Sequence, residues 1–145
     1  MNLRTGRIAD GFALVAFGLV FAAGLAVIAV DPAAATTDRV EIHIRYSHYD
    51  QAQMSVPVGV AVTFVLRNDD PIDHEFIVGD AAVHERHRTG TEPVHGSRPT
   101  EVTIPAGTTR ATTITFTKPG SYLYICHLPG HEAYGMVGTL VVRGN

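Results

Sequence analysis

The chain is poor in the features that mark many protein classes. It has one cysteine, Cys126, no tryptophan, and only 17% charged residues among 145. A single cysteine excludes an internal disulfide, and in an exported protein a leftover thiol is explained most economically by metal ligation. The formal net charge is −3 and no acidic or basic run occurs, so the chain lacks the electrostatic footprint of a nucleic-acid-binding protein.

The amino-terminal segment 1–35 is predicted to be a membrane anchor or a signal segment. Arg4 and Arg7 precede the uncharged stretch 12–30, which as a helix at ~1.5 Å per residue would cover ~30 Å of bilayer. The arginines favour a cytoplasmic amino end. Small residues at 33–35 would also suit cleavage of a leader, so anchor and cleaved leader both remain open. Both interpretations export residues 36–145 to the extracytoplasmic side of the cell membrane.

The remainder of the chain has the patterning of strands. In residues 39–46 apolar side chains alternate with polar ones, which places Val40, Ile42, Ile44 and Tyr46 on one face. Further short apolar segments, bounded by turn residues, are 58–66, 74–78, 102–104, 110–117, 122–126 and 138–142. This spacing predicts an all-β fold, an antiparallel β-sandwich with Greek-key connections. The long connection 79–100 is expected at the surface, with a short helix at 81–88.

One stretch carries the strongest chemical signal. Cys126, His131 and Met136 stand five residues apart, between two predicted strands. A thiolate, an imidazole and a thioether suit a soft one-electron metal, and a blue-copper centre combines one Cys and two His with a weak axial Met. His74 is the candidate for the second imidazole, because a polar, proline-containing turn passes into an apolar strand there.

These pieces together resemble the cupredoxins, the plastocyanin/azurin-like family of type 1 blue-copper proteins. The matching elements are the histidine that opens a strand, the segment 120–126, the Pro-Gly-His at 129–131 and the segment 135–142. The resemblance implies one mononuclear type 1 copper ion bound by His74, Cys126, His131 and Met136. It also implies a monomeric domain that transfers single electrons to redox partner proteins by weak, transient docking. Zinc tolerates similar ligands, so the resident metal stays open at this point.

The chain departs from the family where an asparagine commonly follows the first histidine and a serine or threonine follows the cysteine. Here Glu75 and His127 take those places. We hypothesise that a charge-assisted hydrogen bond between them ties the two ligand segments together. The alternative is that both side chains point to water.

Three further histidines, His84, His87 and His95, occupy the long connection. They could collect copper for delivery or recognise a partner. A solvated loop is the favoured interpretation, because spacing alone is a weak metal signal.

Two functions compete for such a domain. As an electron carrier, it would present the ring edge of His131 at a surface lined by Pro71, Leu128, Pro129, Tyr134 and Gly135. As a copper-holding or copper-delivery protein, it would buffer metal outside the cell membrane. We do not expect an enzyme, because the paired histidine signatures of multicopper oxidases and a Ser-His-Asp arrangement are absent from the sequence. A metal-free adhesive sandwich is the last alternative.

Overall fold

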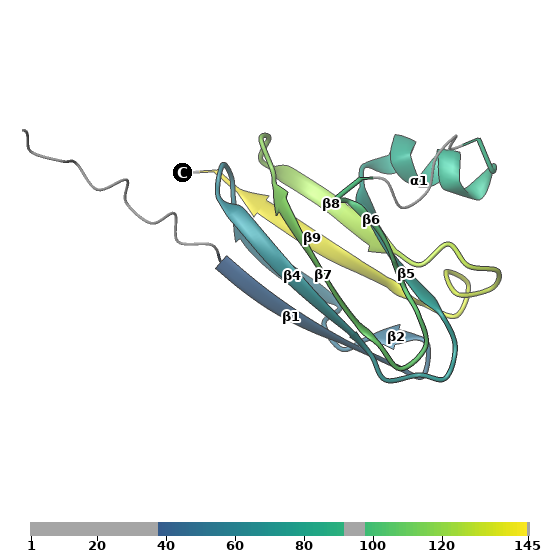
Figure 1. The fold of residues 1–145 in the computed structure, drawn as a ribbon. Helices are drawn as coiled ribbons and strands as arrows, with labels where there is room; N and C mark the ends of the chain where they lie inside the picture. The colour runs from purple at the N-terminus through teal and green to yellow at the C-terminus, as the bar shows by residue number, and fades with distance from the viewer. Residues whose placement is uncertain (1–37, 92–97, 145) are drawn as a thin grey trace, which may run out of the picture. The chain divides into compact units, whose positions relative to one another are not determined.

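The computed structural model describes residues 38–91 and 98–144, which fold as two packed β-sheets (Figure 1). The first sheet has the order β2-β1-β4-β7, with bounds His48–Tyr49, Asp38–Arg45, Ala61–Asn68 and Thr109–Thr115. The second has the order β3-β9-β8-β5-β6, with bounds Gln53–Pro57, Val137–Arg143, Gly120–Ile125, His74–Gly79 and Glu101–Ile104. The predicted β-sandwich is confirmed, and each of the seven predicted strands is present with slightly shifted ends.

The strand directions correct the prediction of a purely antiparallel sandwich, because both sheets are mixed. β1 runs parallel to β4, and β3 runs parallel to β9. The short strands β2 and β3, which sequence analysis missed, explain the first pairing. The chain leaves the first sheet after β2, forms β3 in the second sheet, and returns as β4 in the direction of β1.

The predicted anchor or leader at 1–35, with its hydrophobic helix at 12–30, lies outside the described residues. His95 lies outside them as well. Within residues 38–91 and 98–144, no helix is long and apolar enough to cross a membrane.

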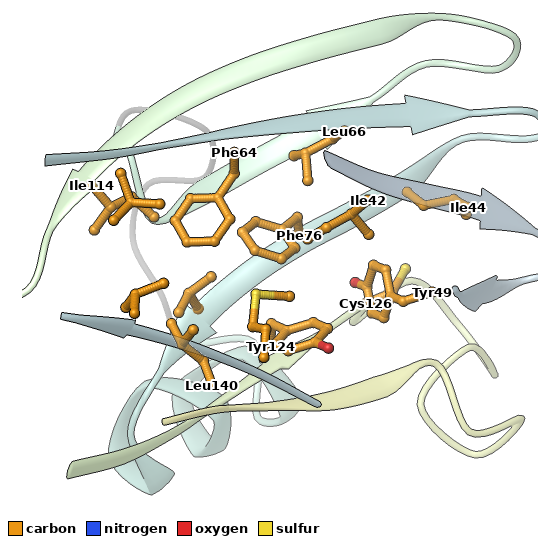
Figure 2. Close-up of a cluster of buried hydrophobic side chains, with 14 of the residues drawn as sticks. Ile42, Ile44, Tyr49, Phe64, Leu66, Phe76, Ile114, Tyr124, Cys126 and Leu140 are labelled. Carbon is orange, nitrogen blue, oxygen red and sulfur yellow. The ribbon is translucent and has the colours of Figure 1, made fainter. Parts of the chain in front are cut away.

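The core lies between the sheets and is built from aromatic and branched side chains. Phe64, Phe76 and Tyr124 are fully buried, and Figure 2 shows them among the other residues of this cluster, Cys126 included. The alternation predicted for β1 holds for Ile42 and Ile44, both fully buried. It fails for Tyr46, which is 89% exposed, because β1 ends at Arg45 and Tyr46 adopts a positive φ of 53° in the following turn.

The hairpin of β8 and β9 frames the segment that carries Cys126 and His131. Ile125, the last residue of β8, pairs with Val137, the first of β9, so both ends of the intervening loop are clamped together. Gly138 is required beside this point, since a Cβ there would lie 1.9 Å from the ring of Tyr124. A fully buried aromatic residue therefore packs directly on the β9 backbone at the base of the loop.

The short helix expected at 81–88 is confirmed as α1, Ala81–Arg88. Asp80 caps it by accepting a hydrogen bond from the N–H of Val83 at 3.0 Å, and arginines in the last turn complement the helix dipole. A Cβ on Gly79 would lie 2.5 Å from Val83, so glycine permits α1 to turn back closely onto β5. α1 packs against β5 and β8.

Candidate metal centre

The structure brings together three of the four predicted ligands. His74 is the first residue of β5, Cys126 directly follows β8, and His131 lies midway along the loop to β9. One donor atom from each lies within 4.8 Å of the others. The Nδ1 atoms of the two histidines are 3.2 Å apart, and His131 Nδ1 is also 3.2 Å from Cys126 Sγ. His74 and Cys126 are fully buried and His131 is half-buried.

The fourth predicted ligand, Met136, is fully buried and belongs to the same core cluster as Cys126. Its backbone N–H donates to the carbonyl of His131 at 3.0 Å, and its carbonyl accepts from the N–H of Cys126 at 3.2 Å. Gly135, with a φ of 93°, supplies the sharp turn just before it. These bonds fix the loop around Met136, while ligation by its thioether stays a prediction.

The Cys126 sulfur lies in surroundings that disfavour a free thiolate. Burial raises the pKa of the thiol to about 11. The backbone N–H of Glu75 donates a hydrogen bond to the sulfur at 3.3 Å, and the backbone of Leu128 forms another. A bound cation would lower the pKa of Cys126 and so oppose the effect of burial, because metal coordination stabilises a thiolate directly.

Asp70 orients the His74 ring, a role that sequence analysis missed. Its carboxylate lies 2.9 Å from His74 Nε2 and also accepts the backbone N–H groups of Tyr46 and Ser47 at 2.7 and 2.8 Å. Burial raises the pKa of Asp70, but these hydrogen bonds outweigh it and the pKa lies below its usual value. The carboxylate therefore holds the proton of His74 on Nε2 and leaves the Nδ1 lone pair facing the other donors. The four-residue spacing between Asp70 and His74 is the one signal that could have indicated this contact.

The protonation of His131 also suits a metal. Burial, and then the neighbouring His74, lower the pKa of His131, so the ring is neutral at physiological pH. Neutral imidazole and thiolate are the forms that bind metal. One sulfur and two imidazole nitrogens converging at a buried point fit copper, whose preferred ligands include both types.

A second group of imidazoles corrects two sequence-based expectations. His127 does not pair with Glu75: its Nε2 lies 3.0 Å from Nδ1 of His84, and its ring stacks on His87 with centroids 5.2 Å apart. The solvated loop favoured for these residues is also wrong for His84 and His87, which α1 buries at 0% and 8% exposure. Burial lowers the pKa of His127 to about 4, with His84 adding to the effect. We call His84, His87 and His127 the second histidine cluster.

Comparison with known proteins decides the family. Residues 36–143 match the model of the copper-binding proteins of the plastocyanin/azurin family. The chain belongs to this family. Copper is therefore its cofactor, and the grouping of His74, Cys126 and His131 fits that metal.

Two of the proteins similar to this chain are named for copper resistance. The chain is 36% identical to the Copper-resistant cuproprotein CopI of Rubrivivax gelatinosus over 66% of this chain and 59% of that protein. It is 28% identical to the protein of the same name from Pseudomonas aeruginosa, over 77% of this chain and 79% of that one. In the first case the chain spans less than two thirds of the relative's length.

Solved structures agree with the fold. A structure of auracyanin B superposes with a TM-score of 0.61 at 25% identity, covering 73% of this chain and 88% of that chain. The chain therefore shares its overall fold with auracyanin B.

Proposed function

We propose that this domain transfers single electrons through a type 1 copper centre formed by His74, Cys126 and His131, with Met136 as a weak axial ligand. The observation that carries the proposal is the convergence of two Nδ1 atoms and one sulfur within 4.8 Å. Copper bound there would supply a reversible one-electron couple.

Rigidity of the surrounding chain supports electron transfer. Copper prefers different geometries in its two oxidation states, so a frame that resists rearrangement favours rapid exchange. Three features supply that frame here. Asp70 fixes the His74 ring, the β8–β9 pairing clamps the loop, and the N–H of Glu75 holds the sulfur.

The surface around His131 supports weak docking of redox partners. His131 is the half-buried member of the three, and the loop beside it exposes Pro129, Gly130 and Tyr134, the last at 75%. Ile72, 47% exposed, adds an apolar side chain from the turn before β5. A small surface of this kind suits brief encounters between monomeric proteins. We assign no catalytic activity to it.

The proposal places the domain on the extracytoplasmic side of the membrane, held there by the amino-terminal segment. The basis is the arginine-flanked apolar stretch 12–30 in the sequence. Separating membrane from soluble fractions of expressing cells tests this location. Recovery of the full-length chain in the cytosol would contradict it.

A spectrum and a potential test the electron-transfer function. Copper(II) added to the full-length protein should produce an intense visible thiolate band that disappears on reduction and returns on reoxidation. Cys126→Ser should abolish the band. Colourless copper binding by the wild-type protein, or a coloured Cys126→Ser variant, would contradict the proposal.

A second candidate function is copper holding or delivery in copper resistance. It is favoured by the two relatives named Copper-resistant cuproprotein. Here the copper-loaded protein should give its metal to a chelator or partner domain readily, and electron exchange should be slow. Rapid electron self-exchange together with slow copper release would favour the carrier.

A further inference from the structure

The second histidine cluster gathers three imidazoles from two distant segments of the chain. His84 and His87 lie three residues apart on one side of α1, and His127 is the residue after Cys126. The rings of His84 and His127 have centroids 5.3 Å apart. Their side chains are nearly inaccessible to water, at 0% for His84 and 5% for His127.

The hydrogen bonds of His84 determine which of its nitrogens carries a proton. Nε2 lies 3.2 Å from the carbonyl oxygen of Leu123, and the carbonyl of Gly79 also favours a proton on this ring. A carbonyl oxygen only accepts, so Nε2 of His84 donates to Leu123. In the neutral ring Nδ1 then carries the lone pair, and it faces His127.

The tautomer of His127 is set by its contact on the opposite side of the pair. Its Nδ1 lies 3.5 Å from a carboxylate oxygen of Glu132, which attracts the proton of the neutral ring to Nδ1. Nε2 of His127 is then also a lone-pair nitrogen. With these tautomers two lone-pair nitrogens face each other across 3.0 Å, an arrangement that a cation bound between them would stabilise.

The alternative is the other neutral tautomer of His127, in which Nε2 carries the proton and donates it to Nδ1 of His84. That tautomer would leave the lone pair of His127 Nδ1 facing the carboxylate of Glu132, which is unfavourable. The spacing also matches that of the copper centre, where the Nδ1 atoms of His74 and His131 are 3.2 Å apart. A pair of neutral imidazoles at this spacing is prepared to receive a metal ion.

The charges around the pair do not oppose a cation. The cationic side chain that acts on both His84 and His127 is Arg88, and Glu132 binds it through hydrogen bonds as short as 2.6 Å. A carboxylate oxygen of Glu85 lies 3.6 Å from the same guanidinium. The one arginine and two carboxylates leave a net negative charge. His87 donates from Nδ1 to the carbonyl of Val83, which leaves Nε2 as its lone-pair nitrogen. A surface cavity of about 450 Å³, lined in part by His127, Arg88 and Glu132, gives access from solvent.

We propose that Nδ1 of His84 and Nε2 of His127 bind a second copper ion, separate from the ion held by Cys126. Imidazole nitrogen suits copper, and this pair offers it without sulfur. Glu132 acts behind His127 as a positioning residue, fixing its tautomer. The proposal goes beyond electron transfer and does not depend on it.

The test measures copper retained by the full-length protein after titration and desalting. The background variant Cys126→Ser with His131→Ala disables the first centre. It should retain one copper per chain, with the electron paramagnetic resonance couplings of imidazole nitrogen and no thiolate band. Adding His84→Phe should remove that copper, whereas adding the matched control His43→Phe, on the half-exposed surface of β1, should leave it.

A second substitution covers the case in which the buried His84 variant does not fold. His127→Gln in the same background should also lose the copper, and Glu132→Gln should weaken its binding about 10-fold. Copper retention that is unchanged by both His84→Phe and His127→Gln, or a background variant that binds no copper, would overturn the proposal. A wild-type protein without a thiolate band, beside a background variant that keeps its copper, would contradict electron transfer alone.

Discussion

Two groups of histidines lie on either side of the peptide bond between Cys126 and His127. They differ in the atoms and side chains that surround their imidazole nitrogens. Around Cys126 the imidazole nitrogens meet a sulfur, and a carboxylate, Asp70, lies behind the His74 ring. Around His127 two imidazole nitrogens face each other, with the carbonyl of Leu123 behind His84 and the carboxylate of Glu132 behind His127. A similar spacing of nitrogens thus occurs in the proposed redox centre and in the proposed all-imidazole site.

The two groups also rest on different parts of the fold. The first is fixed by the paired ends of β8 and β9 and by the start of β5. The second depends on α1, an eight-residue helix that packs on β5 and β8. Substitutions in the segments that hold one group should therefore leave the other group largely intact.

The largest expected effect comes from removing the sulfur. Cys126→Ser should abolish the visible thiolate absorption, because no other cysteine exists in the chain. His84→Phe should leave the wavelength and intensity of that band unchanged. Visible spectroscopy of the copper-loaded variants checks both. A large spectral change in His84→Phe would show that the two groups are not separate.

The next effects come from two glycine substitutions. One introduces a steric overlap in β9, which holds the first group, and the other introduces one beside α1, which holds the second. Gly138→Ala should lower the free energy of unfolding by about 3 kcal/mol and perturb the copper spectrum, because its Cβ would overlap the ring of Tyr124. Gly79→Ala should lower it by about 1 kcal/mol, because the short helix that carries Val83 can shift outward. Urea unfolding of both variants gives the comparison. A Gly138→Ala variant with wild-type stability would contradict the described packing.

A smaller effect is expected when the carboxylate behind His74 is neutralised. Asp70→Asn should weaken copper binding at the first centre about 10-fold and raise its reduction potential, because the carboxylate stabilises the more positive copper(II) state. Asp73→Asn, in the same turn and hydrogen-bonded to the N–H of Ala106, is the matched control. Equal potentials for the two variants would remove the role assigned to Asp70.

The smallest effect is a pH dependence of the metal-free protein. His127 has a pKa of about 4 when folded and an ordinary value of 6.5. As the pH falls below about 6.5 the unfolded chain takes up the proton first, so the stability present above that pH declines until about pH 4. We expect a loss on the order of 1 kcal/mol, which His127→Gln removes. Chemical unfolding at several pH values measures it, and a slope that persists in the variant would assign the effect elsewhere.

Local sequence signals predicted the parts of this molecule that depend on neighbouring residues. Each of these signals lies within a short stretch of sequence: the alternation in β1, the turn before His74, and the even spacing of Cys126 and His131. So does the capped segment that forms α1, whose bounds were predicted as observed.

The remainder depends on contacts between distant segments. The parallel pairing of β1 with β4 follows from the crossing of β3 to the other sheet, which no local pattern encodes. His127 meets His84 because β8 lies beside β5, and α1 follows β5 directly. Sequence reasoning paired His127 with Glu75 instead, because it followed the family's usual contact rather than this chain's helix.

X-ray absorption at the copper edge tests the central claim most directly, using the full-length protein loaded with one equivalent of copper. We predict one short copper–sulfur contact together with scattering from two imidazole rings, and loss of the sulfur contact in Cys126→Ser. A spectrum with only nitrogen and oxygen neighbours, unchanged by that substitution, would contradict it.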